Sequence, residues 1–283
     1  SLIYDKVKSY LIGIRLFREL GLKIPTETTQ AISADIAEKT QYYGGKSALN
    51  EALAVYGINI DILRQIYIIE AKLDAVYTAL FGTGGAMAPD STQIEQYFAN
   101  HYVRIKYIQI YTGRRYVTDE TGAIQTDENG YYLTQELTNE EKAAQKEKVD
   151  AMMEALAQGT DFETLSDTYA ETDISYYENG FYLSTDSVSS FGTTLVTAAL
   201  EMQEGEIRLV SDENATYLVQ RCTHIPYASL TEVYDTMQLR NVETDCAQEL
   251  YTAYFHELAE NIAINDTLLA SYSIREATPN SRF

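Results

Sequence analysis

The order of strands and helices over Val103–Cys222 constrains the fold of this chain more than any other feature. It opens with an alternating strand at 103–110, followed by an amphipathic helix and a shorter helix. An Asn-Gly-Phe-Tyr turn at 179–182 comes next, then an apolar helix and a final strand at 216–220. Strands and helices mixed in this way predict an α+β region.

Helical periodicity dominates the chain on both sides of this region. Apolar residues recur at helical spacing over Leu2–Leu20, a second helix is expected to open at Pro25–Glu27, and Asp61 is the expected N-cap of a longer helix. Beyond Pro226, the stretch Leu230–Ile264 has a strong apolar stripe and predicts a further helix. The four prolines lie at boundaries, where they cost least, and they separate two helical regions from the central α+β region.

A long insertion separates the first strand of the central region from its first helix. It contains two similar turns, Thr118–Gly122 and Thr126–Gly130, in which Asp or Asn comes before a glycine. This chemistry is typical of hairpin turns, so we expect a small β-hairpin insertion near 112–135. Calcium binding is the alternative explanation for the carboxylates, but the spacing of a calcium loop is incomplete. Thr138–Glu141 then has the pattern of a capped helix start.

The net charge of the chain limits the classes of partner that it is expected to bind. Lys+Arg is 21 and Asp+Glu is 42, so the net charge is −21. A field of this sign repels nucleic acid and disfavours docking on anionic lipid. Basic, unfolded polypeptides are the partners that it would attract, although solubility alone also explains it. The 24 tyrosines suit adaptable contact with polypeptide, and the alternative is that they line cores and sheet faces.

Cysteine and histidine content predicts neither a disulfide framework nor a metal centre. Cys222 and Cys246 fit no metal-binding spacing, and His101, His224 and His256 are scattered. We expect the two cysteines to be free buried thiols, with pairing between the last strand and the C-terminal helix as the alternative. No metal and no cofactor is expected.

The start of the chain bears on its location. No stretch approaches the roughly 20 apolar residues that span a bilayer. The chain begins at Ser1, without methionine and inside a helical pattern. We therefore expect a leader before Ser1, either a signal peptide or a lipid anchor, and membrane attachment only through that anchor.

The ordered motifs resemble a known family of bacterial foldases. The elements over 103–222 resemble the parvulin (PpiC-type) peptidyl-prolyl isomerase domain. The segments Gly-Leu-Lys-Ile-Pro-Thr-Glu at 21–27, Tyr-Gly-Gly-Lys-Ser-Ala-Leu at 43–49, Tyr-Gly-Ile-Asn-Ile-Asp-Ile-Leu-Arg at 56–64 and Pro-Asp-Ser-Thr-Gln-Ile-Glu-Gln-Tyr-Phe at 89–98 resemble the N-terminal chaperone domain of PrsA-type and SurA-type foldases. Together the resemblance covers nearly the whole chain.

The resemblance implies a discontinuous helical chaperone domain. It joins residues 1–100 to the C-terminal helices at 227–283. Between them, residues 101–226 would form the parvulin-like domain, a small antiparallel sheet flanked by helices. The resemblance also implies an extracytoplasmic location, as a secreted or cell-surface bacterial lipoprotein.

Isomerisation of an X-Pro bond makes modest chemical demands. The barrier comes from losing amide resonance, so no nucleophile and no metal is required. A catalyst holds the proline ring in an apolar slot and favours the twisted amide with placed hydrogen bonds. Counting back from Glu204–Ile207, the slot positions of the family fall on Phe191 and Leu195, with Phe181 and Tyr182 beside them.

The polar cluster of the family is replaced throughout. The two strand positions that usually carry histidine hold Tyr107 and Tyr217, and the Cys or Asp position falls near Thr172. A tyrosine hydroxyl can still donate or accept a hydrogen bond, so the sequence allows weak activity. The interpretation that we favour is that both tyrosines are packed on neighbouring strands without a catalytic role.

Three functions remain open from the sequence. We prefer a foldase or chaperone that binds unfolded or proline-containing polypeptides, with a weak or inactive parvulin-like domain. The second is an active peptidyl-prolyl cis-trans isomerase. The third is a structural adaptor or dimerisation module, with a homodimer as its simplest form.

Overall fold

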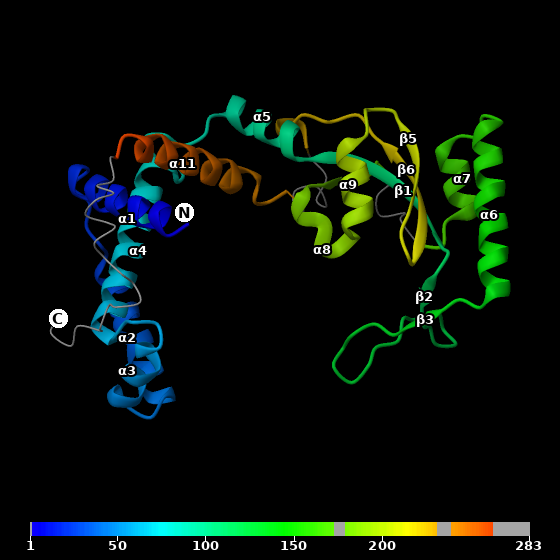
Figure 1. Cartoon of the computed structure of the whole chain (residues 1–283). Helices are drawn as coiled ribbons and strands as arrows, with labels where there is room; N and C mark the ends of the chain where they lie inside the picture. The colour runs from blue at the N-terminus through cyan, green and yellow to red at the C-terminus, as the bar shows by residue number, and fades with distance from the viewer. Residues whose placement is uncertain (1, 173–178, 231–238, 263–283) are drawn as a thin grey trace. The chain divides into compact units, whose positions relative to one another are not determined.

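The computed structural model describes residues 2–172, 179–230 and 239–262 (Figure 1). The chain divides into two compact units. The helical unit joins Ser1–Ser91 to Glu243–Phe283, and the sheet unit is Thr92–Val242. The α+β fold class predicted from the sequence is confirmed, because one unit is helical and the other contains a small antiparallel sheet.

The helical unit is built from two chain segments. Its helices are α1 (Leu2–Glu19), α2 (Thr26–Tyr42), α3 (Lys46–Ala54), α4 (Ile60–Phe81) and α11 (Val242–Glu260). α1, α4 and α11 share one core, in which Ile12, Val76 and Phe255 are buried. This burial of apolar stripes, rather than helix propensity, is what stabilises helices of this length.

Two details of the predicted helices are wrong. The N-cap of α4 is Asn59, whose side chain accepts a hydrogen bond from the Ile62 amide at 2.9 Å, and Asp61 lies in the first turn. The single helix predicted over Leu230–Ile264 is not continuous, because residues 239–241 form a turn and α11 begins at Val242. Residues 231–238 and 263–264 of that prediction lie outside the described residues.

The sheet unit has four strands in the order β4-β1-β6-β5, all antiparallel. The strands are β1 (Val103–Tyr111), β4 (Phe181–Leu183), β5 (Ile207–Ser211) and β6 (Ala215–Arg221). The helices are α5 (Ser91–His101), α6 (Asn139–Ala157), α7 (Phe162–Tyr169), α8 (Val188–Phe191) and α9 (Thr193–Glu201), with 3-10 turns η2 (Thr185–Ser187) and η3 (Tyr227–Ser229). α8 and α9 pack on one face of the sheet, and α6 and α7 pack on the other.

The insertion after β1 is a β excursion, as the sequence indicates. β2 (Arg114–Tyr116) pairs antiparallel with β3 (Thr134–Glu136), and isolated bridges join Thr118 to Ile124 and Thr126 to Tyr132. α6 then begins at a capping box, in which the Thr138 hydroxyl accepts from the Glu141 amide and the Glu141 carboxylate accepts from the Thr138 amide.

The unit boundaries lie at 91/92 and 242/243, whereas the sequence pattern places them at 100/101 and 226/227. α5 packs within the sheet unit, because Phe98 is buried together with Tyr182, Leu239 and Val242. Among the helices of the described ranges, none is long and apolar enough to cross a membrane.

Candidate functional site

Tyr107 and Tyr217, which the resemblance predicts as site residues, lie on the same face of the sheet. β1 and β6 are neighbours, and alternate residues of a strand point to the same face. The rings of Tyr107 and Tyr217 meet edge to face with centroids 5.9 Å apart. This arrangement is favourable for aromatic pairs.

An aromatic row extends from this pair towards α8. The ring of Tyr107 meets that of Phe181 edge to face at 5.8 Å, and Phe181 stacks on Phe191 at 5.1 Å. Leu195 of α9 belongs to the same core cluster. The structure therefore brings the predicted slot residues Phe181, Phe191 and Leu195 together with both tyrosines.

The residues predicted to line the slot are mostly buried. Phe181 and Leu195 are each only 1% exposed, and Tyr107 and Tyr217 are 8% and 9% exposed. Phe191 is half-buried and packs against this cluster from its edge. Among these predicted residues, Phe191 is therefore the one with substantial solvent access.

Tyr182 lies on the opposite face of the sheet from the other predicted slot residues. Its ring contacts Phe98 of α5 at 4.9 Å, and the Arg104 guanidinium lies over it at 5.7 Å. Consecutive strand residues point to opposite faces, so Phe181 and Tyr182 cannot line one pocket. The structure does not bring Tyr182 to the site.

A polar cluster surrounds the Tyr217 end of the aromatic row. The Thr172 hydroxyl donates to Gln109 Oε1 at 3.0 Å, and Gln109 lies directly opposite Tyr217 in the strand register. Tyr111 and Thr172 are neighbours, and the Asp212 carboxylate lies near the Tyr217 hydroxyl. The structure thus connects Thr172 to Tyr217 through neighbours on the same face.

Sequence reasoning missed Gln109, Tyr111 and Asp212. The alternation of β1 could have identified the first two, since positions 107, 109 and 111 must share a face. Asp212 precedes β6, and its Oδ1 accepts from the amides of Asn214 and Ala215. That turn places its carboxylate beside Tyr217, a contact with no signature in the sequence.

Burial sets the protonation state of the phenols. It raises the pKa of Tyr217 above its ordinary value, and the negative charge of Asp212 raises it further. Burial likewise raises the pKa of Tyr111. Both groups stay neutral near pH 7, so each can form hydrogen bonds, but neither titrates in the range where an imidazole does.

An open pocket adjoins this cluster, with a volume of about 350 Å³. Its lining residues come from the end of β1, the β2–β3 hairpin and the β5–β6 turn: Gln109, Tyr111, Arg114, Arg115, Tyr116, Thr134, Glu213, Asn214 and Tyr217. Gly113 permits the hairpin to approach the turn, because a Cβ there would lie 1.9 Å from the Glu213 carbonyl oxygen. Its amide donates to the Asn214 carbonyl oxygen at 2.8 Å.

The chain is similar to solved structures of PrsA. It shares 15% identity with PrsA from Bacillus subtilis, covering 94% of this chain and 86% of that one, with a TM-score of 0.28. For the foldase protein PrsA from Streptococcus pneumoniae the identity is 13%, the coverage 99% and 92%, and the TM-score 0.29. For the peptidylprolyl isomerase PrsA from Bacillus cereus the identity is 13%, the coverage is 93% of this chain and 84% of that one, and the TM-score is 0.35. No family model and no curated protein matches the chain.

In the two turns for which calcium was the alternative explanation, the aspartate side chains accept hydrogen bonds from nearby backbone amides. Asp119 Oδ1 accepts from the Thr121 amide and hydroxyl and from the Ala123 amide, and these bonds lower the pKa of Asp119. Asp127 Oδ1 accepts from the amides of Asn129 and Tyr131. In the part of the chain that the structure describes, no three His, Cys, Asp or Glu side chains are grouped to hold a metal ion.

Both cysteines are free thiols. Cys246 is buried, and Cys222 is half-buried at the end of β6. Burial raises the pKa of each thiol. A thiol with a raised pKa is a poor nucleophile, so neither cysteine adds chemistry to the site.

Proposed function

We propose that this chain is an extracytoplasmic foldase or chaperone that binds unfolded polypeptides, and that its parvulin-like sheet unit has weak or no isomerase activity. The observation that carries the proposal is the buried pair Tyr107–Tyr217, which stands where the resembled family has two histidines. Attachment to a membrane through an anchor before Ser1 belongs to the same proposal.

Two features of the site weaken catalysis. Phe181 and Leu195, which the resemblance places in the slot, are each only 1% exposed, so they offer a proline ring little surface. The Tyr217 hydroxyl is buried beside the Asp212 carboxylate, which makes it a poor donor to a twisted amide. A catalytic group must be held within reach of the reacting bond, whereas Tyr107 and Tyr217 are packed against each other.

The hairpin insertion supports polypeptide binding by the sheet unit. Its apolar side chains include several that are exposed to solvent, among them Tyr131, which is 73% exposed. Tyr116 and Tyr132 meet edge to face at 5.6 Å beside the pocket. Tyrosine offers apolar area and a polar tip, so a group of them suits contact with varied polypeptides.

Two measurements on the whole chain test the proposal. We expect stoichiometric protein to suppress aggregation of a chemically denatured client, and to leave the isomerisation rate of a proline peptide near the uncatalysed rate. Absence of any protection would overturn the chaperone function. A clear rise in isomerisation rate would favour the second candidate, an active prolyl isomerase.

A matched pair of variants localises the binding surface. Tyr131→Ser/Tyr132→Ser removes two exposed rings from the hairpin, and we expect it to weaken protection. Tyr42→Ser/Tyr56→Ser removes two exposed rings from the helical unit and is the control. Equal effects of the two double variants would contradict a role of the hairpin.

A further inference from the structure

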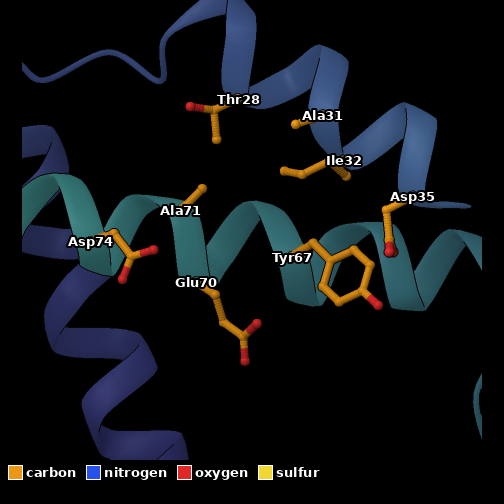
Figure 2. A pocket seen from close by; sticks show the side chains of 8 residues that line it. All are labelled: Thr28, Ala31, Ile32, Asp35, Tyr67, Glu70, Ala71 and Asp74. Atoms are coloured by element: carbon orange, nitrogen blue, oxygen red, sulfur yellow. The ribbon is translucent and has the colours of Figure 1, made fainter.

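A groove runs between α2 and α4 within the helical unit. Figure 2 shows its lining residues, four from each helix. The groove has a volume of about 410 Å³ and is lined by Thr28, Ala31, Ile32, Asp35, Tyr67, Glu70, Ala71 and Asp74. It is large enough to hold several side chains of a bound peptide.

The lining combines a small apolar floor with carboxylates. Ala31 and Ile32 of α2 face Ala71 of α4 across the groove, and their side chains form the floor (Figure 2). Three of the other lining residues are acidic, and no lysine or arginine lines the groove. The floor therefore suits small apolar side chains, while the charged groups select for a cation.

The carboxylates of α4 have little cationic compensation. Among the described residues, no lysine or arginine lies within ion-pairing distance of Glu70 or Asp74. Glu70 Oε1 accepts a hydrogen bond from the neutral hydroxyl of Tyr10 at 3.3 Å. These two carboxylates are four residues apart on one helix, so they are neighbours and repel each other.

Asp35 is the third carboxylate that lines the groove. One of its oxygens, Oδ1, pairs with Lys39, so its charge is compensated within α2. The other oxygen, Oδ2, is buried and has no hydrogen-bond partner. The carboxylates of Glu70 and Asp74 are therefore the ones in the groove without a cationic partner among the described residues.

We propose that this groove binds a short cationic segment of a client polypeptide. A lysine or arginine side chain lies between Glu70 and Asp74, and small apolar residues cover the floor. Charge complementarity selects this occupant over acidic or uncharged segments, and the net charge of −21 concentrates cations near the surface. The inference rests on the proposed binding of polypeptide clients and assigns one class of client segment to one groove.

Fluorescence anisotropy with a labelled peptide of lysines interspersed with alanine and leucine tests the proposal on the full chain. We expect saturable binding that weakens as salt is added. Glu70→Gln/Asp74→Asn should weaken it about fivefold to tenfold, from the magnitude of two partly exposed ion pairs. The control Glu38→Gln/Glu51→Gln removes the same number of exposed charges from α2 and α3 and should leave the affinity unchanged.

A second variant blocks the groove rather than neutralising it. Ala71→Arg places a bulky cation on the floor, and we expect it to abolish peptide binding while circular dichroism shows an unchanged helix content. Equal affinity of the wild type for a peptide with glutamate in place of lysine would overturn the proposal. So would unchanged affinity in the Glu70→Gln/Asp74→Asn variant.

The outcomes separate this inference from the proposed function. If the wild type suppresses aggregation but the groove variants bind the basic peptide as it does, only the groove assignment fails. If the wild type gives no protection to any denatured client, the chaperone function itself fails. Loss of peptide binding in both groove variants, with the control unaffected, supports the groove.

Discussion

The rings of Tyr107 and Tyr217 meet edge to face at 5.9 Å on adjacent strands, and the Asp212 carboxylate lies near the Tyr217 hydroxyl. The pair joins the aromatic core of the sheet to the polar pocket beside it. Substitutions in this pair are therefore a direct test of the site.

Removing the Tyr217 hydroxyl should destabilise the sheet unit. Tyr217→Phe keeps the ring and deletes a buried hydroxyl that lies near the Asp212 carboxylate, so we expect the free energy of unfolding in urea to fall by about 1 kcal/mol. Tyr131→Phe is the control, because its exposed hydroxyl should contribute nothing measurable. Equal stability of both variants and the wild type would show that the Tyr217 hydroxyl contributes nothing.

Alkaline pH should destabilise the protein through the same residue. Because the pKa of Tyr217 is raised, the folded state holds this proton more tightly than the unfolded chain does. Its contribution to stability is complete below about pH 10 and is lost as the pH rises through the folded pKa. Urea unfolding above pH 10 should therefore show a smaller alkaline loss of stability in Tyr217→Phe than in the wild type.

Introducing histidines at positions 107 and 217 should not by itself give catalysis. We expect Tyr107→His/Tyr217→His to isomerise a proline peptide at close to the uncatalysed rate, because Phe181 and Leu195 remain buried. A protease-coupled proline-peptide assay measures the rate, with the wild type as the reference. A large gain in the isomerisation rate of this variant would mean that the lack of imidazoles at these two positions alone limits the activity.

Gly113 should be intolerant of a side chain. Gly113→Ala places a Cβ against the Glu213 carbonyl, so we expect a loss of about 1–3 kcal/mol in unfolding free energy. Amide NMR shifts should change around 112–116 and 212–217. In the control, Gly122→Ala, the backbone conformation is strained at φ 85° but no atom obstructs the Cβ, so the change should be smaller and confined to that turn.

Acid should destabilise the sheet unit through His224. Burial lowers its pKa, and its ring packs on Phe98 at 4.5 Å. A depressed histidine pKa contributes stability that is complete above the ordinary pKa near 6.5 and is lost as the pH falls through the folded pKa. Thermal unfolding at pH 7 and pH 5 should show a smaller acid loss of stability for His224→Gln, whereas the exposed His256→Gln should behave as the wild type.

Local signals determined much of the fold from the sequence alone. The capping pattern at Thr138–Glu141 forms as predicted, because both partners lie within one turn of each other. The insertion forms a β excursion for the same reason, since Asp119 and Asp127 bond to amides a few residues away. Asp61 was predicted as an N-cap, but Asn59 has that role because its side chain reaches the Ile62 amide.

The arrangement of the site and its neighbouring cavities depends on long-range packing. The family resemblance placed Tyr107, Thr172 and Tyr217 in one group, but only the tertiary structure shows that Gln109 bonds to Thr172 and lies opposite Tyr217. The pocket beside Tyr217 and the α2–α4 groove are likewise formed by separate segments of the chain. Periodicity and capping depend on neighbouring residues and can be read from the sequence, whereas cavities depend on which distant faces meet, and that is decided by burial in the folded state.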